Sequence, residues 1–307
     1  NDNIKIVASG QAVEAEAALP IVSATQISGS ANNYSSKIIA LADGTAIVTG
    51  SYFGSISIGG LSLAGSTATP SIYIAKRSAN GAYQWATSVN TTNYVNVEDI
   101  TLSSADSSLI ITGIVLGSAT FGAQTITSDS SYSASYQDGY VAKLDSNGAF
   151  VWASRYGSVF GEGSYSVSSC TDGTAIVVGH FGGTASFGSL SATADPSGDA
   201  SIIKVKPDGT FDWIRTVGGP SGNPDYSQSV ATLDDGSSVV VGWFSGIGQF
   251  GANQYQSAGL DDVFITKFDK NGNCVWASRA GSSGTDWASA VSAFSDGSSI
   301  VSGFFTN

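Results

Sequence analysis

NGAFVWASRYG at residues 147–157 and NGNCVWASRAG at residues 271–281 are two copies of one motif, separated by more than a hundred residues. Both residues of an Asn-Gly pair tolerate the positive φ of a tight hairpin turn, so the pair followed by an apolar run predicts a turn and a strand. Aligned on its Trp, the motif recurs at intervals of 61 to 67 residues, with Ile21 in a degenerate first copy. The aligned residues are Ile21, Trp85, Trp152, Trp213 and Trp276.

Three further markers recur with the same period. An Asp that precedes an apolar stretch ending in Gly stands at Asp43, Asp106, Asp172, Asp235 and Asp296. A Lys nine residues before the Trp closes a strand-like stretch at Lys76, Lys143, Lys204 and Lys267. A Phe-Gly pair follows at Phe121, Phe187 and Phe250, with Ile58-Gly59 as its first version. Four short strands separated by tight turns in each repeat of about 60 residues are typical of a propeller blade.

The repeats predict an all-β fold, a five-bladed β-propeller of four-stranded antiparallel blades that forms a single domain over residues 1–307. The expected repeats are 20–84, 85–151, 152–212, 213–275 and 276–307, the last completed by residues 1–19. The closing blade is therefore shared between the N- and C-termini, because DNIKIV at 2–7 resembles the Asp-led stretch DGYVAK. Its Phe-Gly strand is missing, which leaves three alternatives: a three-stranded blade, help from residues 8–20, or a chain that continues past Asn307. The only helical candidate is AVEAEAA at 12–18.

Composition excludes several classes of function. Charged residues are 12% of the chain, the net charge is −12, and only four of the 24 acidic residues are Glu. Asp is common in turns and Glu in helices, so much of the acidity belongs to turns. An acidic surface argues against nucleic acid and anionic membranes as partners. No apolar run reaches the ~18 residues that would predict insertion into a membrane.

The two cysteines and the Arg of the motif have structural interpretations. Cys170 and Cys274 occupy different phases of the repeat, which favours thiols on strands, and the sequence leaves a disulfide between them open. Arg155, Arg215 and Arg279 recur beside the motif, and we expect each to make a hydrogen bond or an ion pair to a turn.

The repeats resemble the bacterial SBBP-type β-propeller repeat family over about residues 20–305. The resemblance lies in the stretches NYSSKIIALADGTAIVTG, DYSQSVATLDDGSSVVVG and DWASAVSAFSDGSSIVSG. It implies secreted or cell-surface modules without fixed catalytic residues. Two copies depart from the pattern: Ser107 replaces the turn Gly, and GEGSYS at 161–166 replaces the Asp-aromatic pair.

Two sets of residues are candidates for ligand binding. The first contains Asx-aromatic pairs: Asn33-Tyr34, Asn93-Tyr94, Asp225-Tyr226 and Asp286-Trp287. Each pair is either an Asx turn with a packed aromatic ring or one of several equivalent sugar pockets. The second set is the variable position after the conserved Gly, occupied by Ser51, Ile114, His180, Trp243 and Phe304. From it we select His180 and Trp243, while strand-surface packing is the structural alternative.

No catalytic or metal site is expected. A single His and the lack of a GxSxG motif argue against a serine triad. A glycosidase would need two converging carboxylates, and the acidic residues that break the repeat are Glu98, Asp99, Asp129, Glu162, Asp195 and Asp212. The turns DSNGA at 145–149 and DKNGN at 269–273 lack the full pattern of a calcium loop, so structural calcium remains only an alternative.

These features predict a non-enzymatic extracellular or cell-surface module for adhesion or for a structural layer or appendage. Its partners would be glycans or other extracellular proteins, with self-assembly included. The alternatives are a lectin-like glycan binder and, third, a five-bladed glycosidase. Several equivalent pockets would identify a lectin, and one asymmetric cavity with two carboxylates would identify a glycosidase.

Overall fold

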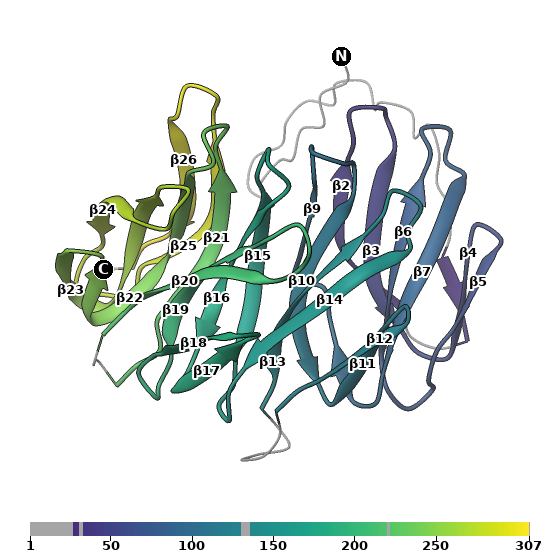
Figure 1. The fold of residues 1–307 in the computed structure, drawn as a ribbon, viewed down its shortest axis with the longest axis horizontal. Helices are drawn as coiled ribbons and strands as arrows, with labels where there is room; N and C mark the ends of the chain where they lie inside the picture. Colours follow the sequence, from purple (N-terminus) through teal and green to yellow (C-terminus); the bar gives the residue numbers. More distant parts are fainter. Residues whose placement is uncertain (1–26, 31–32, 130–135, 220–221, 307) are drawn as a thin grey trace, which may run out of the picture.

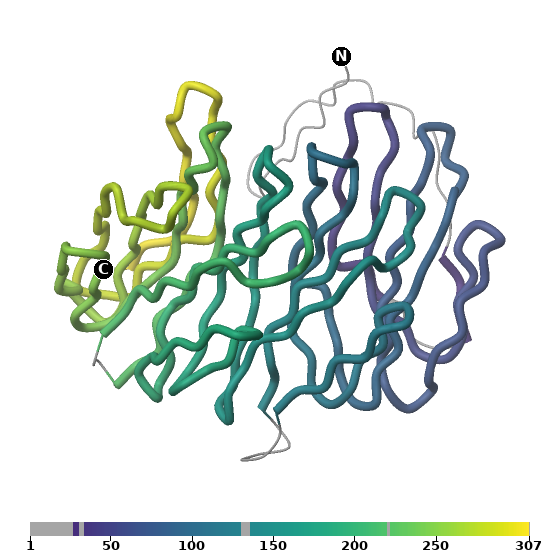
Figure 2. Tube along the Cα trace, in the orientation of Figure 1, coloured from purple at the N-terminus to yellow at the C-terminus, as the bar shows by residue number. Residues whose placement is uncertain are grey.

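The computed structural model describes residues 27–30, 33–129, 136–219 and 222–306 as a row of antiparallel sheets (Figures 1 and 2). Every strand ladder in these residues is antiparallel, and none of them forms a helix. The all-β prediction is confirmed. The helical candidate at 12–18 lies outside the described residues.

Four repeating units each contain four main strands in sequence order. Unit 1 contains β2 (Asn33–Ala40), β3 (Ala46–Tyr52), β6 (Ser71–Arg77) and β7 (Tyr83–Thr91). Unit 2 contains β9 (Asp99–Leu102), β10 (Leu109–Leu116), β13 (Asp138–Leu144) and β14 (Phe150–Gly157). Unit 3 contains β15 (Gly163–Ser169), β16 (Ala175–Phe181), β19 (Asp199–Val205) and β20 (Phe211–Val217). Unit 4 contains β21 (Tyr226–Thr232), β22 (Ser238–Phe250), β23 (Asn253–Phe268) and β24 (Cys274–Ala280).

The described part of unit 5 is a single hairpin of two strands. It contains β25 (Trp287–Ala293) and β26 (Ser299–Phe304). In units 2 to 4 the second strand pairs on its other edge with a strand that contains an Asp, which begins β13 and β19 and lies within β23. No described strand takes that place beside β26.

The Phe-Gly stretch is not one of the four main strands. It forms a small hairpin between the second and third main strands, and this hairpin lies against the unit before it. The separate hairpins are β4 (Ser55–Ile58) with β5 (Leu61–Ala64), β11 (Ser118–Phe121) with β12 (Gln124–Thr127), and β17 (Thr184–Phe187) with β18 (Leu190–Thr193). In unit 4 the ends of β22 and β23 form it.

These hairpins connect neighbouring units through backbone hydrogen bonds. β11 pairs with β7 of unit 1, and β17 pairs with β14 of unit 2. A single bridge from Gly218 to Gln249 makes the same connection between units 3 and 4. The strand β1 (Ile27–Gly29) pairs with β4 and thus occupies the place of a last main strand before unit 1. A short strand, β8 (Tyr94–Val95), pairs with the end of β10.

The Trp strand is the last strand of its unit, so repeat boundaries placed at each Trp divide the observed sheets. Lys143 pairs with Trp152, and Lys204 with Trp213, across hairpins that belong to one sheet. The reason is the turn itself, since a tight turn requires its two strands to be neighbours. The predicted start of the fifth repeat at 276 is accordingly the end of unit 4.

The repeated Trp joins each unit to the turn of the next. The indole Nε1 of Trp85, Trp152 and Trp213 donates to the carbonyl oxygens of Ser146, Pro207 and Lys270, at 3.1, 2.8 and 3.3 Å. The turn glycines Gly148, Gly209 and Gly272 lie directly on these indole rings. The motif recurs because one unit supplies the ring and the next supplies the Gly that fits against it.

In the described residues, no turn Gly of a following unit lies on the indole ring of Trp276 in unit 4. Its exposed fraction is 39%, against 7% for Trp152 and 8% for Trp213. The β4–β5 hairpin and the β25–β26 hairpin lie at opposite ends of the row (Figure 1), so the described residues form an open array. The closing blade shared between the termini is not formed by these residues, and its predicted strand at 2–7 lies outside them.

Candidate binding surface

A continuous row of aromatic rings crosses units 3, 4 and 5. Neighbouring centroids lie 4.6 to 5.6 Å apart, within the range of favourable ring contacts. Phe304 is exposed at one end, and the other five rings are half-buried. We call these residues the aromatic row: Tyr165, His180, Tyr226, Trp243, Trp287 and Phe304.

Strand register places these rings side by side. Tyr226 pairs with Trp243, and Trp287 pairs with Phe304, across the first two strands of units 4 and 5. Residues directly opposite each other in an antiparallel pair point to the same face. Trp243 then stacks on Trp287 at 4.8 Å and 24°, which carries the row from one unit to the next.

Unit 3 builds its part of the row differently. Gly163 pairs with His180 at the position where units 4 and 5 have an aromatic residue. The ring is supplied by Tyr165, whose hydroxyl lies 3.0 Å from His180 Nδ1. Burial lowers the pKa of His180 to about 4, so the imidazole is neutral at physiological pH.

Four predicted site residues therefore come together: His180, Tyr226, Trp243 and Trp287. Sequence reasoning missed Tyr165 as a member because a Gly occupies the aligned position. Phe304 was recognised only as a variable position. Tyr165 lies at a register irregularity between Ser164 and Ser166, so the regular alternation of strand side chains gave no signal for its place in the row.

A pocket of about 480 Å³ opens beside the row between units 4 and 5. The rings of Tyr226, Trp243 and Trp287 form one wall, and Asp261 and exposed Leu260 lie on its rim. Trp287 Nε1 donates to Asp261 Oδ2 at 3.0 Å, which fixes the indole. Flat rings next to a carboxylate and hydroxyl groups can stack on a sugar and accept from its hydroxyls.

The acidic members of the predicted pairs face inward. Asp225 Oδ1 accepts from the backbone N of Ser245 at 2.8 Å, and Asp286 Oδ1 accepts from that of Thr306 at 2.8 Å. Both carboxylates are buried. They fix the backbone beside the row and do not reach the pocket surface.

Units 1 and 2 do not continue the row. Asn33 begins β2, and exposed Tyr34 lies opposite Ser51, which offers no ring. Asn93 and Tyr94 do not occupy the position equivalent to Asp225-Tyr226. Asn96 takes the place of Tyr226, because its carbonyl oxygen lies over Gly113 as that of Tyr226 lies over Gly242, and its Oδ1 accepts from the backbone N of Ile114 at 2.9 Å.

Tyr94 instead borders a smaller pocket of about 240 Å³ with Ser51 and Glu98.

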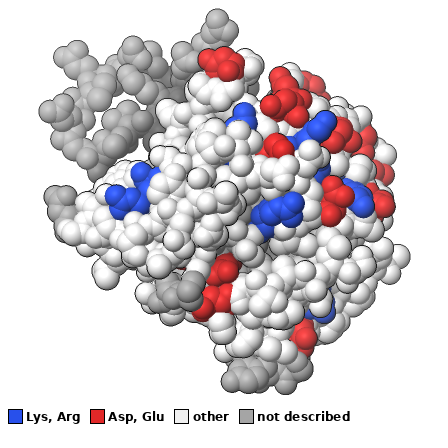
Figure 3. Space-filling view, turned by 60° about the vertical axis from the view of Figure 1, so that its left-hand side comes forward, with Lys and Arg blue, Asp and Glu red and all other residues white. Residues whose placement is uncertain are grey.

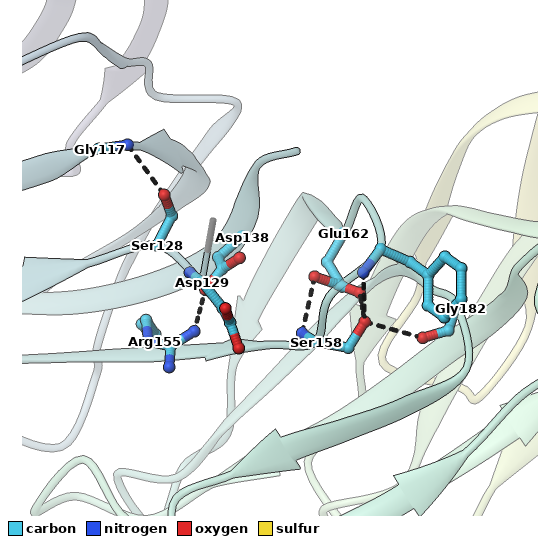
Figure 4. A network of polar contacts seen from close by, with 9 residues as sticks. Gly117, Ser128, Asp129, Asp138, Arg155, Ser158, Glu162 and Gly182 are labelled. Carbon is cyan, nitrogen blue, oxygen red and sulfur yellow. Dashed lines mark hydrogen bonds and ion pairs between the residues drawn. The ribbon is translucent and has the colours of Figure 1, made fainter. Parts of the chain in front are cut away.

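The stretch GEGSYS contains the acidic residue of the third copy, which the alignment with the Asx-aromatic pairs did not identify. Glu162 precedes β15 as Asp225 precedes β21, and its Oε2 and Oε1 accept from Ser158 N at 3.0 Å and Ser158 Oγ at 2.5 Å (Figure 4). Burial raises the pKa of Glu162 to about 7. This copy thus has a different acidic residue at a position that units 4 and 5 also use.

The other acidic residues that break the repeat also have local partners. Asp99 Oδ2 accepts from Ser166 Oγ at 2.8 Å, and Asp195 Oδ1 from Ser197 Oγ at 2.6 Å. Glu98 Oε1 accepts from Asn96 Nδ2 at 2.5 Å. Asp129 donates its backbone N to Asp138 Oδ2 at 3.0 Å, and Asp212 lies 3.5 Å from Lys206.

The recurring Arg residues divide into two kinds. Arg155 and Arg279 form ion pairs with Asp138 and Asp262, which are completely buried (Figure 4 shows the first pair). Arg215 instead donates from Nε to the carbonyl oxygen of Gly272 in the turn of the next unit at 2.7 Å. The expected turn contact is correct for Arg215, while the other two bind strand residues.

The proposed calcium turns form hairpins closed by their own Asp. Asp145 Oδ1 accepts from the backbone N of Asn147 and of Ala149, and Asp269 Oδ1 accepts from that of Asn271 and of Asn273, all at 2.8 to 2.9 Å. Within residues 27–30, 33–129, 136–219 and 222–306, no three His, Cys, Asp or Glu side chains form a metal-binding group.

Cys170 and Cys274 are free thiols, so no disulfide joins them. Figure 3 views the C-terminal side of the molecule, where most charged side chains gather in the upper right part and much of the remaining surface is uncharged. None of the described residues belongs to a helix of the length and apolarity that crossing a bilayer requires.

Comparison with known proteins identifies no family. No protein-family model matches the sequence, and no curated protein matches it. Among solved structures, a protein of unknown function from Bacteroides caccae matches with a TM-score of 0.36 and 8% sequence identity. That match covers 81% of this chain and 82% of the other.

Proposed function

We propose that the chain is a non-enzymatic binding module of a secreted or cell-surface protein, and that it acts in adhesion by holding glycans along the aromatic row. The observation that carries this proposal is the row itself. Six rings from three units meet, three of them at the variable position after the recurring Gly, and a pocket lined in part by Asp261 opens beside them. Aromatic faces and edges with nearby hydrogen-bonding groups suit the mixed apolar and polar surface of a sugar.

The environment of the carboxylates argues against a glycosidase. Burial raises the pKa of Asp138 and Asp199 to about 6, of Glu162 to about 7 and of Asp225 to about 8. Such shifts are typical of catalytic acids, but these side chains are buried beneath the strands. A general acid must reach the glycosidic oxygen, and these carboxylates are covered by protein.

The fold we propose is the five-bladed propeller with a closing blade completed by residues 2–7. The first strands of successive units pack beside one another, as the inner strands of a propeller do. The described residues of unit 5 include no Asp-led third strand, and DNIKIV has the sequence character of one. A closing turn above Trp276 would give this indole the cover that the other units have.

Binding is tested by retention on a panel of insoluble and soluble polysaccharides, with release of reducing ends measured in the same samples. We expect retention without release. Trp243→Ala should weaken it by about 30-fold, the loss expected when a central aromatic contact worth ~2 kcal/mol is removed. Phe294→Ala is the matched control, because Phe294 is exposed in unit 5 outside the row. Equal losses in both variants, or release of reducing ends, would contradict the proposal.

A structural subunit is the second candidate, favoured by the unpaired edge of β26. Ile300, Phe304 and Phe305 are exposed on or directly after this strand. An open strand edge with apolar neighbours accepts a strand from another copy of the chain. Light scattering of the chain without residues 1–19 separates the cases. Loss of an oligomer supports exchange between copies, and an unchanged monomer with a lower Tm supports ring closure within one chain.

A further inference from the structure

Buried carboxylates recur at the junctions between units. The third strand of units 2, 3 and 4 contains Asp138, Asp199 and Asp262; the first two begin their strands, and Asp262 lies within β23. The next unit contributes Glu162, Asp225 and Asp286 just before or at its first strand. All six side chains are buried. An isolated buried carboxylate is costly, so each junction needs a compensating group.

Two of the three junctions contain an Arg. Arg155 pairs with Asp138, and Arg279 Nη1 lies 2.5 Å from Asp262 Oδ2. The register explains the placement, because Arg155 stands opposite Tyr140 and Arg279 opposite Phe264, each two residues after its Asp.

The junction between units 3 and 4 lacks that cation. Thr216 stands opposite Ser201, two residues after Asp199, at the place that Arg occupies in the other two junctions. The neighbouring Arg215 is directed away and donates to the carbonyl oxygens of Gly272 and Asn271. The charged groups that act on the pair from the surrounding elements are Asp195 and Asp261, and both are acidic.

The two carboxylates of this junction approach the same glycine, Gly218. Among the described residues, buried Asp199 Oδ1 and Asp225 Oδ2 have no hydrogen-bond partner, as is also true of Asp138 Oδ1 and Asp262 Oδ1 in the other two junctions. A Cβ placed on Gly218 would lie 2.7 Å from Asp199 Oδ1 and 2.5 Å from Asp225 Oδ2. Both oxygens therefore lie against Gly218, close to each other, and Asp225 has no exposed surface.

We propose that Asp199 and Asp225 bind a Ca²⁺ ion, which takes the place of the arginine in the other junctions. Ca²⁺ prefers carboxylate oxygens and binds them at 2.3–2.6 Å. Its two positive charges balance the two carboxylates. Carbonyl oxygens and water would have to supply the remaining ligands, an arrangement typical of the weaker extracellular sites with Kd of ~0.1–1 mM.

This site is separate from the hairpin turns at 145–149 and 269–273, whose Asp oxygens already accept backbone hydrogen bonds. It also does not depend on the aromatic row or on glycan binding. Its role is to neutralise both carboxylates where units 3 and 4 meet, whereas Arg155 and Arg279 each pair with an Asp of their own unit.

The test uses the full chain after EDTA treatment at pH 8, titrated with Ca²⁺ in a calorimeter and melted with and without 10 mM Ca²⁺. We expect one ion per chain and a rise in Tm of about 3 °C, the shift for a ligand at roughly ten times its Kd. Mg²⁺ at the same concentration controls for ionic strength and should have less effect, because it demands a regular octahedral site.

Three variants locate the ion. Thr216→Arg should abolish the Ca²⁺-induced shift and give a Tm in EDTA at least equal to that of the parent, because the guanidinium replaces the ion. Asp225→Asn should also abolish the shift. Asp269→Asn, in the exposed turn, should retain it. A parent chain that binds no Ca²⁺, or a shift that survives in Thr216→Arg or Asp225→Asn, overturns the proposal. Asp199→Asn replaces whichever of these two variants fails to fold.

Discussion

Replacing Gly209 by Ala should destabilise the protein through two separable effects. Gly209 has a φ of +86°, and an L side chain in this region costs about 1–2 kcal/mol. A Cβ at this position would also lie 2.6 Å from Cδ2 of Trp152 in the preceding unit. The indole is held by its bond to the carbonyl oxygen of Pro207, and such overpacking costs about 1–3 kcal/mol. The expected total is therefore about 2–5 kcal/mol.

Gly173→Ala is the matched control within the same unit. Gly173 has a φ of +82°, and its added Cβ would meet only ordinary contacts, the nearest at 3.4 Å from Ala105. Urea unfolding followed by circular dichroism and by Trp fluorescence measures both variants. We expect Gly173→Ala to lose about 1–2 kcal/mol and Gly209→Ala to lose about 1–3 kcal/mol more. Equal losses would refute the contact between the turn and the indole.

Three further changes test other parts of the structure. Ser107→Gly should stabilise the chain by ~0.5–1 kcal/mol, because Ser107 has a φ of 57° where the other copies have Gly; a lower Tm would contradict this. Glu162 has a folded pKa raised from 4.5 to about 7, so the parent should lose up to about 3 kcal/mol of stability as the pH rises from ~4.5 to ~7 and the unfolded state ionises first. Across this window the free energy of unfolding of Glu162→Gln should change less with pH than that of the parent. An unchanged pH dependence would assign the effect to other groups. Arg279→Met should cost about 3 kcal/mol in denaturant unfolding at pH 7.5, because it leaves buried Asp262 without its partner; a neutral result would show that Asp262 is satisfied without Arg279.

The sequence predicted the strands and turns well because their signals are local. Asp43, Asp106, Asp172, Asp235 and Asp296 close the same Asx turn in each copy, with Oδ1 accepting from the backbone N two residues later. The Trp period also predicted packing between units. Which strand belongs to which sheet was harder to predict, because a period fixes spacing but leaves the starting point of the repeat undetermined.

Long-range geometry accounts for what the sequence could not provide. The role of the Phe-Gly hairpins depends on which unit they touch, and no local signal carries this. The burial of Asp225 and Asp286 follows from neighbouring units packing over them. Tyr165 was missed because alignment by position placed Gly163 in the aromatic column, whereas the ring comes from the register irregularity between Ser164 and Ser166.

The contact between each indole and the following turn has a consequence for how such a chain can change in length. The bonded residues lie 61, 55 and 57 positions apart, so every contact reaches forward by about one repeat. A unit inserted by tandem duplication would place its turn Gly on the indole of the preceding unit. Its own indole would contact the turn Gly of the following unit. Lengthening by whole units therefore needs no new complementary surface, whereas a cut inside a unit leaves an indole without its glycine.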